Sequence, residues 1–411
     1  MIHDTRVINM TTYGILRAVH RSALFAQWRL LPAVLGSVVM FATALAAPTT
    51  TSSTPPPVPA PPAVAAKAYI VLDFNSGQVL AESSADSRVE PASLTKIMTA
   101  YVVFSELEAK HTRLDALVTI SENAWRTGGS RSFVEVGKQI PVQALIMGMI
   151  VQSGNDATVA LAEHIAGSEE VFANVMNQRA QELGMQASHF TNSTGLPDPN
   201  HYTTARDLAT LAQAMIAEFP DYYQWYSTKE FTYNGITQPN RNSLLWSEGG
   251  VDGMKTGHTE AAGYCLVASA LRNKMRLISV LLGTNSEKSR AQETQALLNY
   301  GYRFYETHRL YGPNDPITTA PLWKGERAEL PLGVKEALYV TVPTGQAREL
   351  NVAANLPDVL LAPAAQGQTM GSVKVSLQGQ LIAERPLIAL QSVAEGGLVS
   401  RTVDAIKLMF Q

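Results

Sequence analysis

The feature that most constrains the fold is the order of the hydrophobic periodicities along residues 67–308. Strand-like runs stand at both ends of this stretch, at 69–74 and 78–82 and again at 264–271 and 275–282. Each pair is joined by a short polar turn, and the second pair is typical of an antiparallel hairpin. Helical runs fill the middle, at 93–108, 142–151, 156–165, 169–183 and 205–218, and another follows at 286–305. Strands at both ends of a helical block predict one α+β domain with an antiparallel sheet.

The pattern changes beyond residue 311. Short apolar runs such as 338–342 and 373–377 alternate with turn residues, which predicts a small β-sandwich-like domain over 311–392. Residues 397–411 return to helical spacing, with six apolar side chains on one face. These are Leu398, Val399, Val403, Ile406, Met409 and Phe410.

The N-terminal segment has the pattern of a secretory signal. Arg17, Arg21 and Arg29 precede an apolar run over 30–47, which ends in Ala-Leu-Ala and is followed by proline. We expect a signal peptide over 1–46; the alternative is an uncleaved anchor, and translation is expected to start downstream of Met1 because the part before Arg29 is long for a signal. Residues 47–66 are rich in Pro, Thr, Ser and Ala and predict an extended, disordered linker.

Charge and cysteine content exclude several classes of protein. The net charge of −3 argues against a dedicated nucleic-acid binder, which would carry a basic face. A single cysteine, Cys265, allows no intramolecular disulfide or cysteine-rich metal site, and its apolar neighbours predict burial. No glycine-rich phosphate loop or His/Asp cluster is evident, so we expect no cofactor and no metal.

Three short motifs carry the candidate chemistry, and the first joins Ser93 to Lys96. Residues three apart lie on the same helix face, so the two side chains are expected to meet at the first turn of a helix. A serine hydroxyl becomes a good nucleophile when a neighbour takes its proton, and a lysine of lowered pKa can do this. Alone, the pair also fits an exposed helical serine and lysine.

The second motif, Ser153 to Asn155, interrupts two helical runs. Gly154 permits a tight turn, from which the serine can relay a proton to a leaving group and the asparagine amide can bind a substrate backbone. Ser121-Glu122-Asn123 also matches Ser-x-Asn, but it lacks the position between two helices. The alternative for either copy is an ordinary turn or helix cap.

The third motif, Lys255-Thr256-Gly257, precedes the 264–282 hairpin and is expected on a strand. The ammonium and hydroxyl suit a substrate carboxylate, and the glycine allows another backbone to approach closely. Taken alone, it also fits a surface turn.

Together, in this order, the motifs resemble those of the low-molecular-mass penicillin-binding proteins of the D-alanyl-D-alanine carboxypeptidase family. Residues 91–99, 152–157, 190–196 and 252–259 also read as family signatures, and the resemblance covers about 67–411. It implies a β-lactamase/transpeptidase-like catalytic domain over 67–308, then the small all-β domain and the C-terminal amphipathic helix.

The resemblance also implies the site. Ser93 would attack the carbonyl between two terminal D-alanines, Lys96 would be the general base, and Ser153 would pass a proton to the departing D-alanine. Asn155 and Gly257 complete the motifs, while Lys255, Thr256 and His258 would line the carboxylate site, with the backbone N–H groups of Ser93 and His258 as oxyanion donors. Arg241 and Arg290 are family-like positions for further polar contacts; their alternative is a solvated surface charge.

Three rivals remain at this stage. A class A β-lactamase would add a deacylating glutamate, but residues 191–198 contain none, so penicillin should acylate Ser93 and leave slowly. A D,D-endopeptidase that cuts peptide cross-links uses the same motifs, which do not separate it from a carboxypeptidase. A non-catalytic peptidoglycan-binding scaffold would be indicated by loss of Ser93 or Lys96, and both are present.

The expected partners are a peptidoglycan stem peptide ending in D-Ala-D-Ala and β-lactam antibiotics as covalent inhibitors. The 397–411 helix resembles the family's amphipathic membrane anchor, although Arg401 and Lys407 are its only cations and Asp404 opposes them. We therefore expect a periplasmic protein attached to the outer face of the inner membrane; the alternative is a helix packed on the β-domain.

Overall fold

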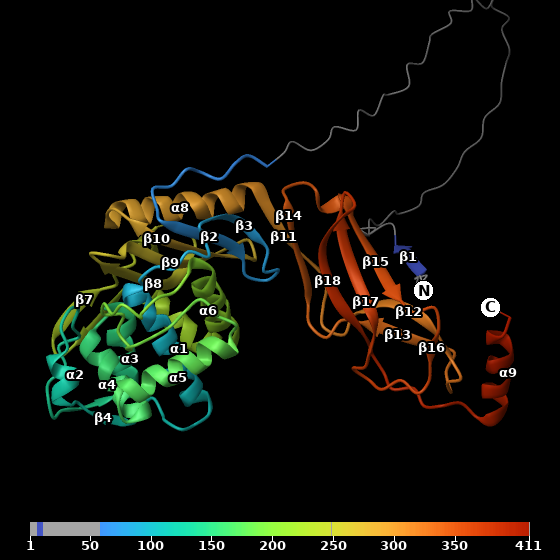
Figure 1. The fold of residues 1–411 in the computed structure, drawn as a ribbon, viewed down its shortest axis with the longest axis horizontal. Coiled ribbons are helices and arrows are strands. Elements are labelled where there is room, and N and C mark those ends of the chain that lie inside the picture. Colours follow the sequence, from blue (N-terminus) through green and yellow to red (C-terminus); the bar gives the residue numbers. More distant parts are fainter. Residues whose placement is uncertain (1–5, 11–57, 248, 411) are drawn as a thin grey trace, which may run out of the picture.

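The computed structural model describes residues 6–10, 58–247 and 249–410. Figure 1 shows two lobes, of which the first contains a five-stranded antiparallel sheet in the order β3-β2-β10-β9-β8. The N-terminal hairpin therefore pairs with the strands that follow the helical block, and the predicted α+β class is confirmed. The strands are β2 (Ala68–Asp73), β3 (Val79–Ser83), β8 (Val251–Thr259), β9 (Gly263–Arg272) and β10 (Met275–Thr284).

Helices cover both faces of this sheet (Figure 1). The alternation of β10 separates the two cores: Leu277 and Leu281 pack towards α8, whereas Ile278 and Val280 pack into the core of the helical block. The longer helices are α1 (Thr95–Glu108), α3 (Val142–Val151), α4 (Asn155–Ala166), α5 (Glu169–Glu182), α6 (Ala205–Glu218) and α8 (Glu287–Phe304). The short elements are η1 (Ala92–Leu94), β4 (Leu117–Thr119), α2 (Glu122–Arg126), β5 (Gln139–Pro141), α7 (Pro220–Tyr223), η2 (Gln224–Ser227), β6 (Glu230–Tyr233), β7 (Ile236–Pro239) and η3 (Ser243–Trp246).

Side-chain caps explain where several helices begin. The Thr204 hydroxyl accepts a hydrogen bond from the backbone N–H of Asp207 at 3.1 Å, and α6 starts at the next residue, Ala205. The Asp207 carboxylate does not return the bond to Thr204; it accepts from the Ala187 N–H and the Ser188 hydroxyl. A capping box at this helix start is therefore only half formed, because the acidic side chain holds the neighbouring loop.

The second lobe is all-β, as predicted. A seven-stranded sheet, in the order β1-β15-β17-β18-β13-β12-β16, shares one hydrophobic core with the β11–β14 ladder. The strands are β1 (Arg6–Met10), β11 (Tyr305–Tyr311), β12 (Pro316–Trp323), β13 (Glu329–Gly333), β14 (Leu338–Pro343), β15 (Leu350–Leu356), β16 (Leu360–Leu361), β17 (Thr369–Leu377) and β18 (Gln380–Ala389). The short η4 (Ala347–Glu349) precedes β15, and α9 (Leu398–Leu408) ends the described chain.

A buried polar network joins the two lobes. The Asp73 carboxylate, at the end of β2, is fully buried and accepts hydrogen bonds from the Ser76 hydroxyl (2.9 Å) and the Thr307 hydroxyl (2.7 Å). The Thr341 hydroxyl lies 2.8 Å from that of Thr307 and 2.6 Å from that of Ser76. The network therefore ties the first hairpin of one lobe to β11 and β14 of the other.

Most of the predicted signal and linker, residues 1–5 and 11–57, lies outside the described residues. Within it, β1 pairs antiparallel with β15, a contact that the sequence did not predict. Residues 58–66 have no regular secondary structure, but the Tyr300 hydroxyl donates to the Pro59 carbonyl at 2.9 Å, and Val64 and Ala66 pack on the first lobe. None of the helices in the described part of the chain has the length and apolar content needed to span a bilayer.

Candidate active site

The Ser93 motif forms a turn at the start of α1. Ser93 lies in the single 3₁₀ turn η1, and Lys96 lies in the first turn of α1, where one continuous helix from 93 was predicted. The Lys96 Nζ is 3.0 Å from the Ser93 Oγ. Spacing of three residues thus brings the two groups within hydrogen-bonding distance, as the motif predicts.

The other contacts of Lys96 define the direction in which the lone pair of its neutral amine points. Its Nζ donates to the Asn155 Oδ1 and to the Thr194 carbonyl, each at 2.7 Å. A neutral amine has two N–H bonds and one lone pair. When both N–H bonds are engaged in this way, the lone pair is left for the proton of the Ser93 hydroxyl.

Burial makes that neutral form accessible. Lys96 is 1% exposed, and burial, reinforced by the positive charge of Arg241, lowers the pKa of its ammonium to about 7. The carboxylates of Glu169 and Asp156 oppose this shift. Near neutral pH a substantial fraction of Lys96 can therefore accept a proton, which is the requirement for a general base.

The Ser153 motif and Lys255 form the opposite side of the site. Ser153 sits between α3 and α4 with a positive φ of 64°, a backbone conformation typical of a tight turn. The Lys255 Nζ donates to the Ser153 Oγ at 2.9 Å and to the Thr256 carbonyl at 2.9 Å. Burial, together with the charges of Lys96, Arg241 and Arg290, lowers the pKa of Lys255 well below its ordinary value. Ser153 is therefore in contact with a second amine.

Asn155 has structural partners on both ends of its amide. The Oδ1 accepts from Lys96, and the Nδ2 donates to the Gly128 carbonyl at 2.6 Å. The sequence predicted that this amide binds the substrate backbone; in the structure its hydrogen bonds orient Lys96 and hold the loop that contains Gly128.

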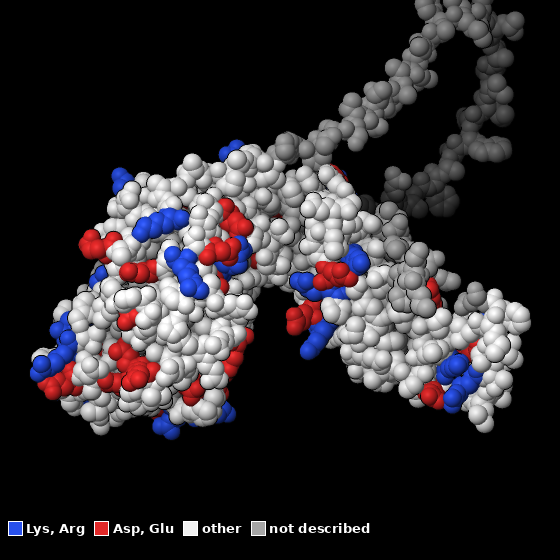
Figure 2. Space-filling model, in the orientation of Figure 1, with Lys and Arg blue, Asp and Glu red and all other residues white. Residues whose placement is uncertain are grey.

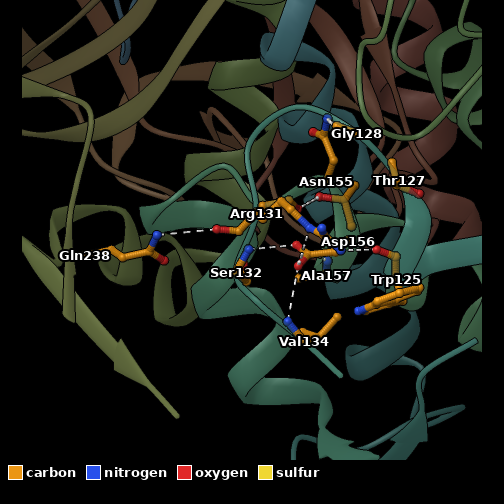
Figure 3. Close-up of polar contacts among 12 residues, drawn as sticks. Trp125, Thr127, Gly128, Arg131, Ser132, Val134, Asn155, Asp156, Ala157 and Gln238 are labelled. Atoms are coloured by element: carbon orange, nitrogen blue, oxygen red, sulfur yellow. Dashed lines mark hydrogen bonds and ion pairs between the residues drawn. The ribbon is translucent and has the colours of Figure 1, made fainter. Parts of the chain in front are cut away.

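The adjacent Asp156 anchors the same loop (Figure 3). Its fully buried carboxylate accepts from the backbone N–H groups of Ser132 (2.8 Å) and Val134 (3.2 Å), and it lies 4.0 Å from the Arg131 Nε. Gln238, on β7, donates to the Arg131 carbonyl at 3.4 Å. The loop beside the Ser153 turn is thus held by Asp156 on α4 and by Gln238 on the β6–β7 hairpin.

Strand β8 brings the third motif close to Ser93. A Cβ added to Gly257 would lie 3.0 Å from the Pro91 carbonyl and 3.3 Å from the Leu94 N, so glycine allows β8 to approach the Ser93 turn closely. Thr256 is buried beside it, whereas the His258 ring is exposed and lies 4.0 Å from the Tyr264 ring, centroid to centroid.

The two predicted arginines differ in exposure. Arg241 is exposed, while Arg290 is 4% exposed, with its Nη2 3.4 Å from the Arg241 carbonyl. Arg290 is therefore not the solvated surface charge that the sequence left open. The positive charges of both residues lower the pKa of Lys255, which places both in the electrostatic field of the site.

The sequence did not assign roles to three residues that complete the site. The Thr194 carbonyl holds Lys96; the Glu169 carboxylate accepts from the Ser193 N–H at 3.0 Å; and the His201 ring contacts the hydroxyl of Thr95 at 2.8 Å. Residues 190–196 were recognised as a signature, but no local pattern shows that a carbonyl from this loop reaches a lysine on α1.

Two further predictions concern residues away from the chemistry. Ser121 caps α2 and donates to Glu163 at 2.6 Å, so the second Ser-x-Asn match is a helix cap. Cys265 is buried, as expected, and burial raises the pKa of its thiol to about 11. No group of three or more potential metal ligands is found among the described residues.

Comparisons with known proteins agree with this geometry. A family model described as D-alanyl-D-alanine carboxypeptidase (Peptidase S11) matches residues 54–286, and one described as penicillin-binding protein 5, C-terminal domain, matches residues 305–395. The chain is 45% identical to D-alanyl-D-alanine carboxypeptidase DacC of Escherichia coli, over 85% of this chain and 89% of the relative. It is 34% identical to DacF of Bacillus subtilis, over 82% and 87%.

The fold is also similar to solved structures. Penicillin binding protein 5 from Haemophilus influenzae superposes with a TM-score of 0.79 at 42% identity, covering 82% of this chain and 99% of that chain. The similarity therefore extends over both lobes and not only over the motifs.

Proposed function

Because the chain belongs to the D-alanyl-D-alanine carboxypeptidase family of serine peptidases, we propose that Ser93 is its nucleophile and Lys96 its general base. The observation that carries this proposal is the 3.0 Å contact between the Lys96 Nζ and the Ser93 Oγ, with the other two Lys96 contacts satisfied by the protein. The protein is thus a serine-type carboxypeptidase, and neither an endopeptidase nor a non-catalytic scaffold is favoured.

The proposed acylation has a simple proton balance. Lys96 takes the proton from Ser93 as its Oγ forms a bond to the carbonyl carbon before the last D-alanine. The amide C–N bond then breaks, and the proton that Lys96 took is relayed through Ser153, which is in contact with Lys255, to the departing amine. Lys96 and Ser153 thus end the step in the protonation states in which they began it. Water hydrolyses the acyl-enzyme in the second step, which returns Ser93 to its free form.

The proposed substrate is a peptidoglycan stem peptide with a free terminal carboxylate. Arg241 and Arg290, beside the Lys255 amine, place positive charge at one end of the site, which favours a carboxylate there. Thr256 and His258 lie on the same strand and are proposed to contact this group. The backbone N–H groups of Ser93 and His258 are proposed to stabilise the oxyanion.

Penicillin is expected to form a lasting adduct on Ser93. Opening the β-lactam ring forms the ester without losing an atom, so the protein mass should rise by the whole mass of the penicillin. Residues 191–198 supply no glutamate to activate a deacylating water. The nearby Glu169 carboxylate accepts hydrogen bonds from the N–H and the hydroxyl of Ser193. Intact-protein mass spectrometry, followed by peptide mapping, measures the adduct. An adduct on another residue, or none, would contradict the nucleophile.

We further propose export to the periplasm and attachment to the membrane through α9. The apolar side chains on one face of this helix and just beyond its end remain exposed, Leu398 by 83% and Phe410 by 87%. Figure 2 shows Lys, Arg, Asp and Glu side chains gathered at the end of the second lobe where this helix lies. Its other face is held to the β-lobe, where the Asp404 carboxylate accepts from the Lys324 N–H at 2.8 Å. Packing on the β-domain therefore leaves the apolar face available for lipid.

A charge on the apolar face should weaken membrane binding. Val399→Asp removes a side chain that is 80% exposed on this face and is expected to lower vesicle affinity about tenfold, as lost burial of roughly 1.5 kcal/mol implies. Ser400→Asp is the matched control, because it adds the same charge in the same helical turn but outside the apolar face. Co-sedimentation with anionic phospholipid vesicles measures both variants. Equal binding of the two would contradict anchoring through this face.

A further inference from the structure

His201 is a buried histidine next to the nucleophile turn, and the proposed mechanism does not use it. The ring is 3% exposed and packs edge-on against Phe190, with 5.6 Å between ring centroids. Its Nε2 lies 2.8 Å from the Oγ1 of Thr95, the residue between Leu94 and Lys96. Its Nδ1 lies 3.2 Å from the backbone N of Thr191 and 3.1 Å from the Thr191 Oγ1.

These contacts require one tautomer of the neutral ring. The Thr191 N–H can only donate, so the Nδ1 of His201 is the acceptor and carries no proton. The Nε2 must then carry the proton and donate it to Thr95. A second proton on the Nδ1 would face the Thr191 N–H. In addition, burial lowers the pKa of His201 to about 4; the charge of Asp198 opposes this shift, and that of His189 adds to it.

The ring therefore links α1 to the loop that holds Lys96. Within this loop the Asn192 Oδ1 accepts from the backbone N–H groups of Thr194 (3.2 Å) and Gly195 (2.8 Å), which fixes the direction of the Thr194 carbonyl. A Cβ on Gly195 would lie only 1.7 Å from the Ala92 carbonyl, so the loop sits directly against the Ser93 turn. His201 is a side-chain bridge across this contact.

We propose that His201 is a positioning residue that locks the nucleophile turn against the 191–196 loop and so keeps the Lys96 amine dry and directed at Ser93. This proposal rests on the roles assigned above to Ser93 and Lys96. Without the bridge, the Thr194 carbonyl can move away from α1, and water can reach the Lys96 Nζ. A hydrated ammonium is more stable than a buried one, so the base would need a higher pH to lose its proton.

The test is the pH dependence of acylation by a fluorescent penicillin, measured on the full chain with His201→Ala, His201→Gln and Thr95→Val. The alanine variant should shift the midpoint of the rising limb upward, and a shift of one pH unit leaves about one tenth of the neutral amine below the midpoint. Thr95→Val keeps the branched shape but removes the acceptor, and the same shift is expected. Glutamine offers one donor and one acceptor and should restore the midpoint.

The chain provides a matched control. The His164 Nε2 lies 2.9 Å from the Thr112 Oγ1, a histidine–threonine contact of the same kind at the far end of α4. His164→Ala should leave the midpoint unchanged. A merely structural role for His201 would lower the unfolding temperature and the active fraction, but not the midpoint of the remaining enzyme.

The outcomes separate this proposal from the function on which it rests. Unshifted midpoints in both His201→Ala and Thr95→Val would overturn the positioning role while Ser93 and Lys96 keep theirs. If His201→Ala does not fold, Thr95→Val alone decides. Acylation that persists in Ser93→Ala would overturn the proposed nucleophile instead. The charges that also act on Lys96, from Arg241, Lys255, Glu169 and Asp156, are unchanged in every variant.

Discussion

Ser93→Ala is expected to lose D-alanine release from a peptide ending in D-Ala-D-Ala by at least about 10⁴-fold, because no other hydroxyl can form the acyl-enzyme. The side chain is half-buried, and its hydroxyl bonds to Lys96, so its removal should leave the fold intact. D-alanine release by the wild-type protein and by the variant is measured under the same conditions, and circular dichroism compares their folding.

Ser279→Ala provides the matched control for this loss. Ser279 is buried on β10, in the sheet of the same lobe, and its hydroxyl has no hydrogen-bond partner within the described chain. This variant should keep full activity. Comparable D-alanine release by wild type and Ser93→Ala would remove Ser93 as the nucleophile. An absence of release from the wild-type protein would count against the stem-peptide substrate.

Lys96→Met is expected to slow penicillin acylation by about 10²–10⁴-fold, the usual contribution of a general base. Methionine fills a similar volume but cannot accept the Ser93 proton. Lys96→Arg should be nearly as slow, because a guanidinium keeps the charge and cannot lose its proton at these pH values. The two variants together distinguish a base from a positive charge that merely attracts the substrate.

The pH profile gives the same distinction in the wild-type protein. Because the neutral amine is the active form and its pKa is about 7, acylation should rise as the pH increases through about 7. Neither lysine variant should show this rise. A rapid Lys96→Arg variant, or a wild-type profile that falls with pH in this range, would contradict the assignment.

Much of the fold follows from patterns that are local in the sequence. Apolar periodicity predicted the observed bounds of α3 and α6, and it predicted the strands of the β9–β10 hairpin to within two residues. A helix or strand that buries one face repeats apolar residues every 3.6 or 2 positions, which makes such elements visible in the sequence. The placement of Lys96 beside Ser93 follows from the spacing of three residues, which brings the two side chains together although Ser93 lies in the 3₁₀ turn before α1. The strand position of Lys255 follows from the apolar run after it.

The remaining parts of the site depend on contacts between distant segments. The Thr194 carbonyl meets Lys96 across 98 residues, and His201 meets Thr95 across 106. A backbone carbonyl has no residue type by which to recognise it, and a lone histidine is more often a core residue than a functional one. The burial of Arg290 likewise depends on how α8 packs, since its neighbours on the helix are polar.

The position of β8 has a consequence for the behaviour of the protein in solution. β8 is an outer strand of its sheet, and an unpaired strand edge is where soluble proteins tend to join into aggregates. The Ser93 turn packs against one face of β8 at Gly257, so the segment that carries the proposed nucleophile also covers part of this outer strand. Substitutions that loosen this turn are therefore expected to reduce solubility as well as turnover, and loss of soluble protein would be an early sign of a displaced nucleophile.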